Sequence, residues 1–419
     1  MNLKFDELEK NVKIMNSFRY KDTNAWIHVK FNLFLDNLVQ NTSKTIHKKK
    51  HLKLIGINIL NLFKGLNKEY MYFGSSRGLR MYQDKVVDLY FPYEKVAIEY
   101  CKVFLTLNNV NDVKKFDHFY KENSVLSDSV FNVFTNLLSV ILSKFWAFYK
   151  FEETYNQCCY LNIKVSRQKL LRYYLDFIIK YNFYTIVFSF QKKCKGAYLV
   201  SAYSKSYICA VLKKRLIPVT EIQHGHIGKS HIGYNYHYTE GLPLPDRILV
   251  YNDFWAKEIK RSNFPVNIDY QSSMKYELVK YEQNPFDFKY LIYTGQGQNK
   301  DSISNFIMDS LEYLKNKDLK LVYKPHPSER EASFEIKELC LRNSDCLLYY
   351  EGNVSSEKLI SEAIAHISIS SFCHFDAIHF LKRTYVLIGS NESQFFNTFC
   401  ESNKSIMIPI TNINQISLS

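Results

Sequence analysis

The sequence has 419 residues, more than one hydrophobic core usually supports, so we expect two domains. Hydrophobic residues make up 46% of it, and its 31 Phe, 32 Tyr and 3 Trp exclude a disordered chain. The formal charge of +14 favours an anionic partner, but charge alone does not choose among a nucleotide, an anionic glycan, a membrane surface and nucleic acid. An AT-rich genome would produce the same excess of lysine without any selection for binding.

The cysteines and the N-terminus indicate a protein of the cytoplasm. Nine cysteines form an odd set without paired CxxC spacing, which fits a reducing compartment. The first 18 residues carry charges where a signal peptide needs an apolar region. The apolar stretch 130–142 contains four polar residues and is too short to span a membrane. We interpret it as a packed helix, and the aromatic residues that follow Lys144 leave a peripheral contact with the inner face of the cell membrane as the alternative.

The first half of the chain opens with helical patterns and continues with short apolar runs. Residues 1–50 are amphipathic with helical spacing and end in a lysine run. Three apolar runs, at 52–60, 71–74 and 86–92, are typical of strands. Two long helical patterns follow at about 125–150 and 166–181, and the second begins with a Ser cap.

From residue 184 the pattern alternates between strands and helices. The spacing predicts a strand at 184–190, a helix at 201–215, a strand at 216–225 that runs into a loop, and another strand at 246–252. Such βαβ units build parallel sheets because their crossovers are right-handed. Ligands of these sheets gather at the carboxyl ends of the strands.

A domain junction is predicted within residues 261–288, which lose periodicity and contain two prolines. A second α/β series follows. Its five strands are predicted at 290–298, 319–327, 346–350, 366–371 and 384–390, and its four helices near 303–315, 329–341, 355–365 and 374–382. The predicted fold is therefore α/β with two Rossmann-like domains, 1–265 and 285–419, and a cleft between them.

Three polar clusters follow predicted strands, and the first occupies residues 221–238. A carboxylate or a neutral imidazole takes a proton from an attacking hydroxyl, so Glu221, His224 and His226 are candidate catalytic residues. Gly225 would let backbone approach a ligand beside His224. We interpret His231 and His237 as structural. A zinc site is the weaker alternative, since no Cys and only one nearby acid accompany the histidines.

The second cluster is the segment LVYKPHPSE at 321–329. Two prolines hold His326 rigidly, which suits contact with a phosphate or leaving group, and Lys324 adds positive charge. Ser328 and Glu329 cap the next helix, whose N-terminus favours anions. Lys324, His326 and Pro327 are therefore predicted to bind the donor.

The third cluster, at 367–380, ends a strand with Ser370 and Ser371, whose hydroxyls suit a phosphate. Asp376 lies one turn later and is predicted to reach a sugar or ribose hydroxyl. Two Gly-containing loops, at 73–80 and 294–299, match neither GxGxxG nor the P-loop pattern. Both are interpreted as lining the cleft, with an ordinary turn as the alternative, and Gly295 and Gln296 join the donor-binding candidates.

The elements E-x-Q-H-G at 221–225, K-P-H-P at 324–327 and S-S-x4-D-A at 370–377 occur in this order. Their set resembles bacterial GT-B glycosyltransferases of capsule and lipopolysaccharide assembly, including the sialyl- and Kdo-transferases with an HP motif, and the likeness covers residues 185–390. The resemblance gives His326 and the serine pair contacts to the donor phosphates and implies catalysis without a metal or other cofactor. The family's helix usually carries Glu where this chain has Asp376.

The resemblance implies a sugar transfer from a nucleotide-sugar to a hydroxyl of a surface glycan or lipid-linked glycan, with a mild preference for CMP-linked acid sugars over UDP-sugars. An acid-acid-Gly element, typical of some sialyltransferases, has only Glu351 and Gly352 as a counterpart here. They lie in the C-terminal domain, which is expected to bind the nucleotide-sugar, and not in the N-terminal domain, which is expected to bind the acceptor. The base is therefore Glu221 or His224, with the choice left open. His326, Lys324 and the serines would stabilise the departing phosphate, at about 3 kcal/mol per well-placed donor.

Three other functions remain as alternatives. A polyol-phosphate transferase of capsule synthesis also places His-Gly and His-Pro elements in a GT-B frame. A nucleotide-sugar 2-epimerase needs several acidic groups around the sugar, and few lie near these loops. A nucleic-acid-binding protein without catalysis would use the +14 charge, but its lysines are scattered and no binding motif is present, so nucleic acid is not the expected partner.

Overall fold

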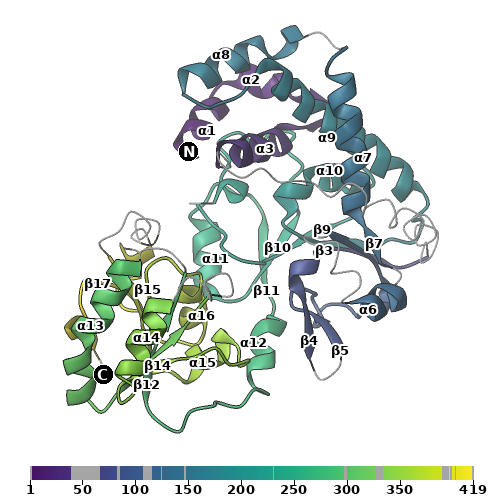
Figure 1. Cartoon of the computed structure of the whole chain (residues 1–419). Coiled ribbons are helices and arrows are strands. Elements are labelled where there is room, and N and C mark those ends of the chain that lie inside the picture. Colours follow the sequence, from purple (N-terminus) through teal and green to yellow (C-terminus); the bar gives the residue numbers. More distant parts are fainter. Residues whose placement is uncertain are drawn as a thin grey trace. The chain divides into compact units, whose positions relative to one another are not determined.

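The computed structural model describes residues 2–38, 67–82, 85–106, 116–123, 125–145, 148–229, 231–296, 300–326, 334–388, 396, 399–401 and 403–417. The chain divides into two compact units, Met1–Met274 and Lys275–Ser419 (Figure 1). Each unit contains a parallel β-sheet with helices, so the predicted fold class of two Rossmann-like α/β domains is confirmed. The division at residues 274 and 275 lies within the segment 261–288, where the sequence places the junction.

The N-terminal unit is built on a seven-stranded sheet of order β11-β10-β9-β8-β3-β6-β7, in which every pair is parallel. The strands are β3 (Tyr70–Ser75), β6 (Cys101–Thr106), β7 (Leu126–Ser127), β8 (Gly196–Val200), β9 (Val219–Ile222), β10 (Arg247–Val250) and β11 (Asn267–Tyr270). The strand predicted at 86–92 instead forms an antiparallel hairpin outside this sheet, β4 (Leu79–Tyr82) with β5 (Lys85–Asp88). The run at 52–60 lies outside the described residues.

The strand predicted at 184–190 is wrong. Residues 184–189 complete the 23-residue helix α9 (Arg167–Ser189), and Phe190 is its C-cap. The neighbouring strand is β8, which the sequence analysis missed. Phe177, Tyr181, Tyr184 and Phe188 are buried at helical spacing, so packing of one face overrides the strand propensity of the β-branched and aromatic residues. Strand β11 lies in the segment predicted to be irregular, and it was missed as well.

The opening arm is helical, as predicted, over the part that the structure describes. It comprises α1 (Asn2–Glu9), α2 (Val12–Ser17), the short strands β1 (Arg19–Tyr20) and β2 (Thr23–Asn24), and α3 (Trp26–Leu38). The Lys30 ammonium lies 2.7 Å from the Glu9 carboxylate, and both side chains are buried. The Glu9 carboxylate also accepts from the indole of Trp26 and, at 2.6 Å, from the backbone N–H of His237. This buried ion pair fixes the arm to the loop that follows β9.

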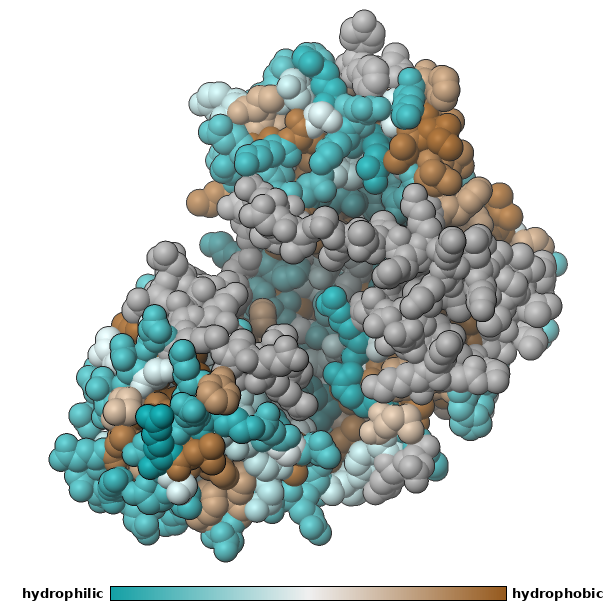
Figure 2. Space-filling model, in the orientation of Figure 1, coloured by the Kyte–Doolittle hydropathy of each residue, from teal (hydrophilic) through white to brown (hydrophobic). Residues whose placement is uncertain are grey.

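The remaining helices of the unit are α6 (Asp117–Glu122), α7 (Asp128–Leu142), α8 (Glu152–Tyr160), α10 (Ser206–Lys214) and α11 (Asp253–Lys260). Helix α7 packs against α9 and confirms the packed helix predicted for 130–142. Large apolar side chains of α7 nevertheless face outward, and Figure 2 shows hydrophobic surface where Figure 1 draws this helix. No helix within the described ranges is long and apolar enough to cross a membrane.

The C-terminal unit has a six-stranded parallel sheet of order β14-β13-β12-β15-β16-β17. The strands are β12 (Tyr290–Thr294), β13 (Lys320–Lys324), β14 (Leu347–Tyr349), β15 (Ala365–Ser368), β16 (Thr384–Leu387) and β17 (Met407–Ile410). The helices are α12 (Met274–Val279), α13 (Lys300–Asn316), α14 (Phe334–Arg342), α15 (Ser356–Glu362) and α16 (Cys373–His379). The five predicted strands and four predicted helices are confirmed in order, and β17 is an additional strand.

Candidate functional site

The carboxyl ends of three adjacent strands, β3, β8 and β9, meet at one edge of the N-terminal sheet. Ser201 follows β8 and His224 follows β9, and the serine Oγ lies 2.9 Å from the imidazole Nε2. Ser201 has a backbone φ of +59°, in the left-handed region that a residue with a side chain seldom adopts. Such strain persists where surrounding contacts enforce it, and it is common at functional sites. The Ser201–His224 pair is therefore the first element of the site.

His224 is half-buried and uncharged near neutral pH. Burial lowers its pKa to about 3, and the charges of His231, Lys205 and Arg77 add to this effect. A Cβ added at the neighbouring Gly225 would meet no heavy atom within 4 Å, so the backbone directly after His224 adjoins open space. A neutral imidazole beside open space can accept a proton from a bound hydroxyl.

Glu221 lies beneath this pair and is fully buried. One carboxylate oxygen accepts from the backbone N–H of Ala202 at 2.9 Å and from the Tyr234 hydroxyl at 2.8 Å. Burial raises its pKa to about 7, against the opposing effect of these hydrogen bonds. Because Ala202 directly follows Ser201, the carboxylate holds the strained turn that presents the serine to His224.

The other histidines of the segment 221–238 have surroundings of their own. His226 is 8% exposed, and its ring centroid lies 5.6 Å from that of His231. Burial lowers the pKa of His226 to about 3 and that of His231 to about 4. The His231 Nδ1 accepts from the backbone N–H of Gly233 at 3.0 Å, which gives this residue a structural role. A catalytic role for His226 remains a prediction.

In the C-terminal unit the carboxyl ends of β12, β13 and β15 also bring polar groups together. The backbone N–H of Gly295, after β12, donates to the carbonyl of Lys324 at the end of β13 at 2.9 Å. The hydroxyl of Ser370, after β15, donates to the side-chain oxygen of Gln296. Three of the predicted donor-binding segments thus meet at one edge of this sheet.

Lys324 and His326 differ in their surroundings. The Lys324 ammonium donates to the carbonyl of Gly352 at 2.7 Å and lies 4.7 Å from the ring centroid of Tyr350, so it faces the loop after β14. His326 is exposed at the strand-end edge. The Ser371 hydroxyl caps the start of α16 by accepting from the N–H of Cys373 at 3.2 Å. Pro327 lies outside the described residues.

Asp376 is buried and has partners on α12. Its Oδ1 accepts from the Lys275 ammonium at 2.8 Å and from the Tyr276 hydroxyl at 3.0 Å. Burial opposes the charge of Lys275, but attraction by Asp376 and Glu357 prevails and raises the pKa of the lysine well above its ordinary value. These contacts attach α12 to α15 and α16, so the structure gives Asp376 a structural task, and its contact with a sugar remains a prediction.

The described residues contain no group of three or more His, Cys, Asp or Glu side chains placed to hold a metal ion. The zinc alternative for the segment 221–238 therefore gains no support from the positions of these histidines. Independence from metals remains a prediction.

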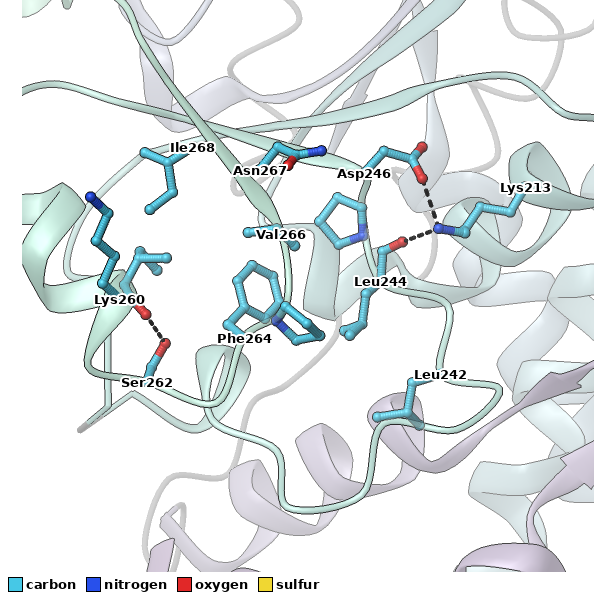
Figure 3. A pocket seen from close by; sticks show the side chains of 13 residues that line it. Lys213, Leu242, Leu244, Asp246, Lys260, Ser262, Phe264, Val266, Asn267 and Ile268 are labelled. Atoms are coloured by element: carbon cyan, nitrogen blue, oxygen red, sulfur yellow. Dashed lines mark hydrogen bonds and ion pairs between the residues drawn. The ribbon is translucent and has the colours of Figure 1, made fainter.

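A cavity of about 580 Å³ lies at the other edge of the N-terminal sheet (Figure 3). Its walls include Leu242, Phe264 and Ile268, and Lys213 at its side pairs with Asp246 at 2.8 Å. Asp246 precedes β10, so the cavity adjoins the amino ends of the strands. Ligands of parallel sheets bind at the carboxyl ends of the strands. This cavity therefore lies at the end of the sheet where a substrate is not expected.

Two residues of the N-terminal site escaped the sequence analysis. Ser201 carries no motif, and its left-handed backbone is not visible in the sequence. Arg77 lies in the loop 73–80, which the sequence analysis interpreted as lining the cleft or as an ordinary turn, and its charge acts on His224. The adjacency of β3 and β8 was the missing information, because it places this loop beside Ser201.

No protein-family model matches the chain, and no curated protein sequence matches it significantly. Among solved structures, the UDP-GlcNAc 2-epimerase from Methanocaldococcus jannaschii is 11% identical with a TM-score of 0.46, over 81% of this chain and 88% of that one. The UDP-GlcNAc 2-epimerase from Neisseria meningitidis bound to UDP-GlcNAc is 13% identical with a TM-score of 0.43, over 80% and 91%. The glycotransferase of kitacinnamycin is 10% identical with a TM-score of 0.42, over 84% and 88%.

Proposed function

We propose that the chain is a metal-independent glycosyltransferase that moves a sugar from a nucleotide-sugar to a hydroxyl of a bacterial surface glycan. The observation that carries the proposal is the strand-end cluster of the C-terminal unit. Hydrogen bonds join Gly295 to the end of β13 and Gln296 to Ser370, at the edge where parallel sheets bind phosphates. The resemblance in the sequence gives His326 and Ser370 the same task.

In this proposal the donor phosphates bind at the edge formed by Gln296, His326 and Ser370. The exposed imidazole would donate to the phosphate oxygens as negative charge builds up on the leaving group, and the Ser370 hydroxyl would do so by exchanging its hydrogen bond to Gln296 for one to the phosphate. Donors held in place before the reaction are worth about 3 kcal/mol each. The proposal includes a mild preference for CMP-linked acid sugars over UDP-sugars as donors.

The acceptor hydroxyl would be activated at the Ser201–His224 pair. The imidazole is neutral, so its Nε2 can take the proton of an attacking hydroxyl, directly or through the Ser201 hydroxyl 2.9 Å away. Glu221 is sealed from solvent and would act by positioning the turn at Ala202. Of the two candidate bases left by the sequence, the proposal selects His224.

The first test is thermal stabilisation of the purified chain by CMP, UDP, GDP and CDP. We expect one nucleotide to raise the melting temperature of the wild type and of His237→Ala, a matched control within the N-terminal unit. The same nucleotide should have little effect on His326→Ala and Ser370→Ala. Stabilisation that survives both substitutions would move the donor site elsewhere, and no stabilisation by any nucleotide would favour the nucleic-acid alternative.

The second test separates the enzyme classes. The nucleotide-sugar matched to the stabilising nucleotide is incubated with and without a glycan acceptor. Transfer that depends on the acceptor is expected. Conversion of the donor sugar to its 2-epimer without an acceptor would establish the epimerase alternative instead, and transfer from a CDP-polyol would establish the polyol-phosphate transferase.

A further inference from the structure

Helix α7 turns hydroxyl side chains inward and exposes three of its large apolar side chains. Thr135, Ser139 and Ser143 are each at most 1% exposed and lie on the face that turns inward. Each hydroxyl donates to a carbonyl three residues earlier, at distances of 2.8 to 3.2 Å. The inward face therefore satisfies its polar groups within the helix and needs no water.

The outward face carries Phe134, Leu137, Ile141 and, just beyond the helix, Phe145. Their exposed fractions lie between 45% and 83%. The spacing of three and four residues places all four side chains on one side of the helix axis. A helix at the surface of a globular protein normally exposes its polar face, so α7 has the opposite orientation.

The apolar surface extends onto the end of α9. The rings of Phe131 and Phe183 lie 4.8 Å apart, so the beginning of α7 adjoins the last turns of α9. Ile186 and Phe190 in that region are at least half exposed. Apolar surface that spans two elements and is open to solvent marks a site of contact with a protein, a membrane or a ligand.

The charged residues that neighbour these side chains in the sequence are lysines, and one of them, Lys195, pairs with Glu69 at 2.9 Å. Residues 129–151 and 183–195 contain five lysines and no aspartate or glutamate. Lys144 is exposed directly before Phe145, and Lys192 and Lys193 are exposed directly after Phe190 and Gln191. Aromatic and aliphatic side chains flanked by lysines suit an interface of acyl chains and anionic headgroups.

We propose that the outward face of α7, together with Ile186 and Phe190, docks the chain on a membrane surface that contains anionic lipids. The apolar side chains enter the boundary between headgroups and acyl chains, and the lysines meet the headgroup phosphates. The inference goes beyond the proposed function and does not depend on it, because it rests on α7 and α9 and on none of the strand-end residues.

The test is co-sedimentation of the full chain with vesicles of phosphatidylcholine alone and with vesicles containing 30% phosphatidylglycerol. The outward-face variant combines Phe134→Ser, Leu137→Ser and Ile141→Ser. The control variant combines Leu216→Ser and Leu381→Ser, two highly exposed leucines outside the patch. Lys192→Ser with Lys193→Ser forms the charge variant. Melting temperatures of all variants establish that each is folded.

We expect wild type and control to bind the anionic vesicles, less at high salt, and the outward-face variant to lose at least tenfold in partition coefficient without a fall in melting temperature. The charge variant should lose affinity for anionic vesicles only. Equal binding by the outward-face variant, or no binding by the wild type, would overturn the proposal. A wild-type dimer in light scattering that the outward-face variant dissociates would overturn it too, because the occupant would then be a second copy of the chain.

Discussion

The substitution Glu221→Gln separates a positioning role from a catalytic one. Burial raises the pKa of the Glu221 carboxyl from 4.5 to about 7. At 1.36 kcal/mol per pH unit, the charged carboxylate costs the folded protein roughly 3 kcal/mol at pH 8. Glutamine has the same shape and no charge, and its side-chain oxygen still accepts from the Ala202 N–H and the Tyr234 hydroxyl.

The sign of the pH dependence follows from proton binding. Between pH 4.5 and 7 the folded chain holds the Glu221 proton and the unfolded chain releases it, so wild-type stability falls as the pH rises through this window. Chemical denaturation at several pH values measures the free energy of unfolding of wild type and of Glu221→Gln. The contributions of the other titrating groups cancel in the difference between the two. We expect this difference to move by roughly 3 kcal/mol in favour of the variant between pH 4.5 and 8.

Two results would refute this reasoning. A stability difference that does not change with pH would mean that the carboxyl does not titrate in this window. A fall in kcat of a hundredfold or more in Glu221→Gln, with nucleotide binding intact, would make Glu221 the base in place of His224.

The remaining predictions concern the base, its pH profile and the N-terminal arm. His224→Gln should lower kcat by a factor of about 10² to 10⁴ and leave thermal stabilisation by the nucleotide unchanged; an unchanged kcat would remove His224 from the reaction. Because burial lowers the pKa of His224 to about 3, kcat measured against pH should show no loss near pH 6.5 from protonation of this residue, and an acid limb there that His224→Gln abolishes would contradict this. Lys30→Met leaves the Glu9 carboxylate buried without its cation and should cost about 3 to 5 kcal/mol in the free energy of unfolding; a loss under about 1 kcal/mol would show that the pair is not buried in solution.

The sequence predicted the C-terminal unit well because its signals are local. Short apolar strands alternate with amphipathic helices there, and the polar segments at 294–296, 324–326 and 370–371 all lie at or after the carboxyl ends of strands. The N-terminal unit was harder for a physical reason. Residues 184–190 have the composition of a strand, and only the buried face that they continue from Phe177 shows them to be helical. Strand β11 is four residues long and only partly buried, so it carries little apolar signal.

The candidate site shows a different limit of sequence reasoning. Glu221 was predicted as a candidate base because a carboxylate can take a proton, and Asp376 as a sugar or ribose contact because it lies one turn after the serine pair. Contact of either residue with a substrate remains a prediction. In the structure Glu221 holds the backbone after Ser201, and Asp376 holds Lys275. An acid that reacts with a substrate and an acid that holds the protein's own groups can have the same residue type and the same position in a motif. Only the burial and the hydrogen-bond partners of the side chain distinguish the two roles.

The contact between Ser201 and His224 depends on Glu221. The serine hydroxyl reaches His224 only because the backbone turns left-handed directly after β8, and that turn is held from the next residue by Glu221, which the chain contributes from β9. The pair that would activate an acceptor thus depends on a third residue that the acceptor does not reach. Loss of the carboxylate's hydrogen bond, rather than loss of its charge, is then the change expected to impair the reaction: Glu221→Leu should lower kcat, where Glu221→Gln should not. Equal activity in the two variants would show that the turn at Ser201 holds without Glu221.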